Sequence, residues 1–164
     1  MTLAMHILNP LRKICDLAYR SSLGSKQPHG FSGAVSHLIS YGMQGEYPEQ
    51  KVDMSKVVIS KGKLVKPYGA YLSAQEGKVV MHWQLTENPS QWLDDEAIGV
   101  LYNEEKDVWQ IIRHEAVRSD LQLTVSLPPE FDGDTLHGYL FFLCRSEKNC
   151  SPSVYLPPVR FGGV

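Results

Sequence analysis

Cysteine, net charge and long apolar runs are all scarce in this sequence, and each scarcity excludes a class of protein. The three cysteines are an odd number without metal-ligand spacing, so we expect free thiols instead of a disulfide scaffold. A formal net charge of −2 provides no basic field to hold nucleic acid. No apolar run approaches the ~20 residues that span a membrane. The start, MTLAMHILNP, lacks the basic residues of a signal peptide. The compartment is unknown, and a soluble protein, cytoplasmic or part of an assembly, is the default expectation.

Catalytic and metal-binding motifs are also missing. The segment Gly30-Phe31-Ser32-Gly33 resembles a serine nucleophile motif, but that motif needs a residue between the serine and the second glycine, and a preceding strand. We expect Ser32 to cap a helix instead. The six histidines show no His-x-His or His-x3-His pairing. We therefore predict no catalytic residue, no cofactor and no metal ligand, and we do not expect an enzyme.

Two carboxylate clusters allow a second metal hypothesis. Asp132 and Asp134 flank a glycine, and Asp94-Asp95-Glu96 precede an apolar run. A calcium loop needs more oxygen ligands than either cluster supplies. We expect the first pair to make hydrogen bonds within a turn. We expect the second cluster to lie in a loop before a central strand, where charge opposes mispairing.

Residues 1–50 are predicted to be a helical segment with two short helices. The first begins at Asn9-Pro10 and runs to Arg20, because asparagine caps helices and proline suits the first turn. The second runs from Ser32 to Met43, after a breaker cluster at 21–28. Helices this short are stable only when packed against another surface. Their apolar stripes contain Leu11, Ile14 and Ala18, then Phe31, Val35, Leu38 and Ile39.

Residues 51–157 change to the two-residue period of strands, starting near Val57. The segment Ala97–Tyr102 is apolar on both faces, as a central strand would be. Seven or eight short strands with turns between them predict an antiparallel β-sandwich of immunoglobulin or fibronectin type III kind, followed by a tail at 158–164. Trp83 matches the position of a core tryptophan, and Tyr139 matches the tyrosine near the start of the penultimate strand. Two strands alternate clearly: Val79, Met81, Trp83 and Leu85 in one, and Leu121, Leu123, Val125 and Leu127 in the other.

Several short motifs resemble an uncharacterised domain family widespread in Bacteroidetes. They are Gly45-Glu46-Tyr47-Pro48-Glu49, Asp53 with Lys56-Val57 and Ser60-Lys61-Gly62, Gly133-Asp134-Thr135-Leu136-His137, and Ser153-Val154-Tyr155. The resemblance covers about residues 10–157. Members usually carry a further N-terminal stretch rich in glycine and basic residues, which this sequence lacks. The resemblance supports the predicted fold and implies no activity.

The features that are present favour an interaction role. We expect a non-enzymatic structural or protein-interaction module within a larger assembly, such as a virion, a cell surface or a mobile element. The expected contacts with a protein partner or a second copy are Leu11, Ile14, Val35, Leu38, Trp92 and Trp109. The alternative is a sandwich that binds a ligand such as a carbohydrate through Trp92 or Trp109.

Overall fold

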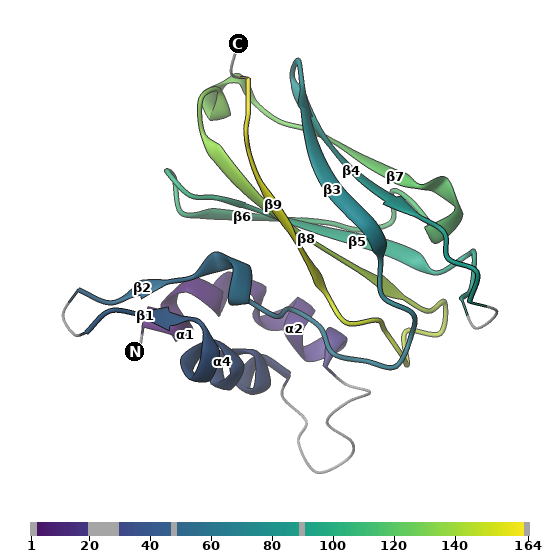
Figure 1. The fold of residues 1–164 in the computed structure, drawn as a ribbon, viewed down its shortest axis with the longest axis horizontal. Helices are drawn as coiled ribbons and strands as arrows, with labels where there is room; N and C mark the ends of the chain where they lie inside the picture. The colour runs from purple at the N-terminus through teal and green to yellow at the C-terminus, as the bar shows by residue number, and fades with distance from the viewer. Residues whose placement is uncertain (1–2, 20–29, 47–48, 89–90, 163–164) are drawn as a thin grey trace.

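The protein is a β-sandwich with a layer of helices on one face (Figure 1). The computed structural model describes residues 3–19, 30–46, 49–88 and 91–162. A three-stranded sheet has the order β3-β4-β7 and a four-stranded sheet the order β6-β5-β8-β9, with every pair antiparallel. The predicted fold class is therefore confirmed. The strands are β3 Tyr68–Gln75, β4 Lys78–Gln84, β5 Glu96–Asn103, β6 Val108–Ile112, β7 Gln122–Ser126, β8 Thr135–Leu143 and β9 Val154–Arg160.

The first helical run is longer than predicted. It consists of α1 (Leu3–Leu8), a 3₁₀ turn (Asn9–Leu11) and α2 (Arg12–Ala18). The Asn9-Pro10 pair therefore lies in its middle instead of at its start, and no side chain caps the 3₁₀ turn. Because Pro10 has no N–H to donate back into the helix, the chain tightens into a 3₁₀ turn at this point. The predicted breaker cluster at 21–28 lies outside the described residues.

The second helix, α4 (Gly30–Tyr41), begins two residues earlier than predicted. Ser32 therefore lies within the first turn and is not the cap residue. Ile39 is half exposed instead of belonging to the buried stripe. A two-stranded ribbon follows, formed by β1 (Met43–Gln44) and β2 (Lys51–Val52), and then a 3₁₀ turn (Met54–Lys56).

The segment 57–65 was predicted to start the sandwich, but it forms no strand. It runs between the helices and the segment 149–153, and hydrogen bonds join it to both. The Lys61 N–H donates to the Ala18 carbonyl, and the Leu64 N–H donates to the Cys150 carbonyl. A Cβ on Gly62 would lie 1.9 Å from the same Cys150 carbonyl oxygen, so only glycine fits this passage.

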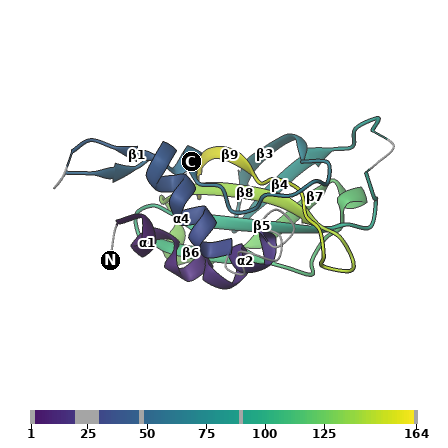
Figure 2. The same cartoon turned by 90° about the horizontal axis from the view of Figure 1, so that it is seen from below.

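Two cores lie on opposite faces of the four-stranded sheet. Met81, Trp83, Leu123 and Val125, which the alternation predicted to be buried, lie between the two sheets together with Phe142. The second core lies between the four-stranded sheet and the helices, which cover that sheet in both views (Figures 1 and 2). Strand β5 contributes alternate residues to the two cores, which confirms the prediction of a central strand apolar on both faces. The sheet residues of the second core are Ile98, Val100, Tyr102, Tyr139, Phe141 and Leu143.

The strand ends differ from the predictions in three places. Leu85 follows the last residue of β4 and is partly exposed. Leu121 precedes β7 with a φ of 64°, which turns its side chain out of the buried row. Strand β9 continues to Arg160 and Phe161 is buried, so the first residues of the stretch expected as a tail belong to the sheet.

Candidate functional site

Four of the six predicted partner contacts are buried inside the protein. Leu11, Ile14, Val35 and Leu38 all belong to the core between the helices and the four-stranded sheet. The prediction that these stripes meet a partner is therefore corrected, because the apolar outer face of β5 and β8 covers them. That face and the helical stripes each need burial, and they supply it to each other.

Trp109 has the same structural role. Its indole Nε1 donates a 2.8 Å hydrogen bond to the Ile7 carbonyl in α1, and its ring centroid lies 4.5 Å from that of Tyr102. Because its indole N–H bonds to α1 and its ring lies beside Tyr102 of the sheet, Trp109 anchors α1 to the sheet. Trp109 is only partly buried, so the prediction that it contacts a partner or a carbohydrate stays a prediction.

Histidine and tyrosine side chains on the same face are paired with one another. His137 Nδ1 lies 2.7 Å from the Tyr155 hydroxyl, and its Nε2 lies 3.2 Å from Glu104. The Tyr139 hydroxyl donates to the Met54 carbonyl at 2.6 Å, so this tyrosine ties the helix layer to the sheet. Burial raises the pKa of Tyr139 above its ordinary value. The hydrogen bonds of His137, Tyr139 and Tyr155 therefore serve to hold the structure together.

The carboxylates do not assemble into a metal site. Asp134 accepts hydrogen bonds from Lys106 Nζ and Asn103 Nδ2, which lower its pKa, and so it joins two loops instead of only its own turn. No group of three or more His, Cys, Asp or Glu able to hold a metal occurs among the described residues. Within the same residues, no helix is long and apolar enough to cross a membrane.

Asp95 forms a buried ion pair that sequence patterns did not predict. Its Oδ2 lies 3.0 Å from Arg118 Nη2, and both side chains are buried. Arg118 also donates to the Val65 carbonyl, and its guanidinium lies 3.9 Å from the centroid of the Phe142 ring. Trp83 Nε1 donates to the Arg118 carbonyl at 2.7 Å. Burial raises the pKa of Asp95, and Arg118 offsets part of that rise.

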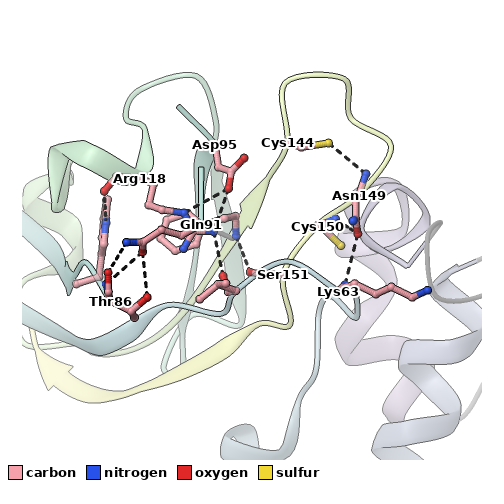
Figure 3. A network of polar contacts seen from close by, with 12 residues as sticks. Lys63, Thr86, Gln91, Asp95, Arg118, Cys144, Asn149, Cys150 and Ser151 are labelled. Carbon is pink, nitrogen blue, oxygen red and sulfur yellow. Dashed lines mark hydrogen bonds and ion pairs between the residues drawn. The ribbon is translucent and has the colours of Figure 1, made fainter. Parts of the chain in front are cut away.

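This ion pair closes one end of the loop between β4 and β5, and a side-chain clamp closes the other end (Figure 3). The Gln91 carboxamide accepts from the Thr86 N–H and hydroxyl at 3.1 and 3.2 Å, and its Nε2 donates to the Thr86 carbonyl. The Asp95 N–H then donates to the Trp92 carbonyl at 3.2 Å. The loop is therefore held by hydrogen bonds on both sides of Trp92.

Trp92 itself points outward, with 65% of its surface exposed, and its neighbour Leu93 is 52% exposed. The Ser119 N–H donates to the Leu93 carbonyl, which joins this loop to the segment before β7. The same segment meets β4, where the Trp83 N–H donates to the Leu121 carbonyl. We call the exposed apolar residues of these joined segments the Trp92 surface: Leu85, Trp92, Leu93 and Leu121.

The three cysteines are free thiols in different surroundings. Cys15 is buried, and burial raises its pKa to about 12. Cys150 does not face Cys144, because its thiol donates to the Ala18 carbonyl at 2.7 Å. Burial alone would raise the pKa of Cys144, but hydrogen bonds from the Ser146 hydroxyl and from backbone N–H groups, including that of Asn149, lower it. Cys144 is therefore the thiol most available for reaction.

Comparison with solved structures returns β-sandwiches at low identity. One is a redesigned β-sandwich protein, with 15% sequence identity and a TM-score of 0.45; the match covers 62% of this chain and 94% of that chain. Another is the fn3 domain of human contactin 1, with 7% identity and a TM-score of 0.43; the match covers 64% of this chain and 83% of that chain. A cytokine receptor complex also matches, with 13% identity and a TM-score of 0.47, over 70% of this chain and 58% of that chain. No curated protein matches. Over residues 1–157 the sequence fits the model of DUF6266, a family of unknown function, and the chain belongs to that family.

Proposed function

We propose that this protein is a non-enzymatic interaction module that binds a protein partner through the Trp92 surface, within a larger assembly. The observation that supports the proposal is the exposure of Trp92 and Leu93 on a loop whose two ends are fixed by the Gln91 clamp and the Asp95–Arg118 ion pair. Of the six contacts expected from the sequence, Trp92 is the one whose side chain is mostly exposed to solvent.

A fixed loop favours binding because less conformational entropy is lost when a partner arrives. Ordering a side chain at an interface costs about 0.5–1.5 kcal/mol, and a loop that is already held avoids part of that cost. Tryptophan is enriched among the residues that dominate binding energy, since it buries a large area with few rotatable bonds. The exposed Leu93, next in sequence, and Leu85 and Leu121, on the joined segments, would enlarge the apolar contact surface.

The proposal can be tested by purifying the tagged protein from its native cells with bound partners. The Trp92→Ser variant should lose the partner that copurifies with the wild-type protein. Tyr41→Ser is the matched control, because Tyr41 is an equally exposed aromatic residue (69%) on the separate helix layer. Both variants should unfold at the temperature of the wild type. Equal recovery of the partner by Trp92→Ser and the wild type would refute the proposed surface.

A photo-reactive benzoylphenylalanine at position 92 gives a second measurement. Irradiation should cross-link position 92 to the same partner, and benzoylphenylalanine at position 41 should not. Cross-linking from position 41 alone would move the contact to the helix layer.

A further inference from the structure

We infer that the β6 edge binds a second copy of the chain, joining two four-stranded sheets into one. This surface is separate from the Trp92 surface and does not depend on it. Among the described residues, strand β6 ends the sheet order and pairs only with β5. Beyond that pairing, its backbone makes none of the hydrogen bonds found among the described residues. Alternate N–H and C=O groups of β6 therefore point outward, ready to pair with another strand.

The other three edges are less suited to pairing. Strand β9 carries Pro157 and Pro158, and prolines cannot donate to a neighbouring strand. Strand β3 has an irregular register at its start and packs beside β9. Strand β7 exposes only polar side chains along its length, so pairing there would bury little apolar surface.

By contrast, β6 exposes apolar side chains on both of its faces. Val108 is 41% exposed and Ile111 is 40% exposed. The sequence of the strand, Val-Trp-Gln-Ile-Ile, contains no proline and no charge. Natural edge strands usually carry such features to prevent association. An edge without them is a template for a further strand.

A second copy fits this edge in one symmetric register. A two-fold axis perpendicular to the sheet at Gln110 makes the two strands antiparallel, as the isologous contact of a dimer requires. It places Val108 opposite Ile112 of the second copy and Trp109 opposite its Ile111. Directly opposite residues share a face of the sheet, so both exposed apolar residues gain an apolar neighbour.

The charges that flank β6 favour the same register. It places Asp107 opposite Arg113 of the second copy, twice by symmetry. Moving the axis to Ile111 would place Asp107 opposite Glu115, which repels it. Moving it to Trp109 would place Asp107 opposite the apolar Ile111. Of these three axes, the one at Gln110 is the one that places Asp107 opposite a residue of opposite charge.

Both members of the charge pair can take part. The Asp107 side chain is half exposed, although it already accepts a hydrogen bond from the Tyr102 hydroxyl. Arg113 holds Glu96 and Glu147 through Nε and Nη2, and no hydrogen bond among the described residues uses its Nη1. The axis also places both α1 helices on the same face of the joined sheet, because α1 lies against β6 through Trp109.

Sedimentation velocity of the 164-residue chain and of two variants tests the inference. The wild type should be in a monomer–dimer equilibrium, and Ile111→Lys should weaken the dimer by more than about tenfold because the substitution occurs twice in a symmetric contact. The control is Leu85→Lys, which changes an equally exposed leucine (40%) in the Trp92 surface. It should leave the dimer unchanged. A wild type that is monomeric at its highest soluble concentration would overturn the inference. Loss of the dimer in Leu85→Lys alone would also overturn it.

A cysteine at position 110 tests the register independently of the Ile111 variant. In this register residue 110 meets its own copy with Cα atoms about 4.5–5.5 Å apart, within the range that a disulfide spans. Mild oxidation of Gln110→Cys should therefore give a covalent dimer beyond the background of the wild type, which carries Cys144. A covalent dimer no more abundant than that background would refute the register. Neither experiment involves Trp92, so a failure here leaves the proposed function intact.

Discussion

Replacement of Leu38 by alanine tests whether the helix layer is part of the core. Leu38 is fully buried, at 0% exposure, in the core between the helices and the four-stranded sheet. Truncating a buried leucine removes its transfer free energy and leaves a cavity, which costs about 2–5 kcal/mol. Since domains of this kind are stable by about 5–15 kcal/mol, Leu38→Ala should remove a large share of the free energy of unfolding.

The adjacent residue supplies the matched control. Ile39 follows Leu38 in the same helix but is 50% exposed. Ile39→Ala should change the free energy of unfolding by at most about 0.5 kcal/mol, as surface substitutions do. Urea unfolding followed by tryptophan fluorescence measures both variants, since Trp109 reports on the helix layer and Trp83 on the sandwich. An unchanged slope against urea would show that stability alone has changed.

Two results would refute this reasoning. If Leu38→Ala and Ile39→Ala both cost less than about 0.5 kcal/mol, the helices do not pack on the sheet in solution. A chain without residues 1–44 should aggregate or unfold, because it exposes the apolar outer face of β5 and β8. A truncated chain that stays folded and soluble would contradict the packing just as directly.

Three further predictions concern single groups. Iodoacetamide at neutral pH should alkylate Cys144 before the two buried cysteines, as mass spectrometry would show, and equal rates would contradict the lowered pKa of this thiol. Burial would raise the pKa of Glu96, but hydrogen bonds from Arg113 and a backbone N–H lower it overall. Glu96 therefore stabilises the fold above its unfolded pKa of about 4.3, and this contribution is lost as the pH falls through the lower pKa of the folded state. Thermal unfolding of Glu96→Gln should therefore show lower stability at pH 7 and a weaker loss between about pH 5 and 3 than the wild type; parallel curves would refute this. Gly62→Ala should destabilise the fold or prevent its expression in soluble form, because its Cβ would collide with the Cys150 carbonyl, and a wild-type unfolding temperature would show that the two segments are not in contact.

The sandwich could be predicted because its signal is local. Strands β4 and β7 alternate apolar and polar residues, and the buried Trp83 lies where that alternation placed it. The stretch Ala97–Tyr102 also predicted a central strand. Such patterns depend only on neighbours along the chain.

The partner of each apolar surface could not be predicted in this way. The apolar stripes that contain Leu11 and Leu38 indicated that the helices needed a surface to cover them. The apolar residues on both faces of β5 indicated that each face of its sheet needed a cover as well. Nothing in the spacing of either showed that the two cover each other. The Asp95–Arg118 pair, 23 residues apart, has no local pattern at all. The exposure of Trp92 could not be predicted either, because it depends on a loop that such distant contacts hold.

The helix layer has a consequence for the order in which this chain can fold. Three of its attachments span most of the sequence: Trp109 binds Ile7, Tyr139 binds Met54, and Cys150 binds Ala18. Ribosomes release the N-terminal end first, at about 5–20 residues per second. The helices therefore leave the ribosome several seconds before the strands that cover them, and helices this short gain little stability on their own. We expect them to remain open to chaperones until β8 and β9 have been made, so that the helices, which are synthesised before these strands, become native together with or after them.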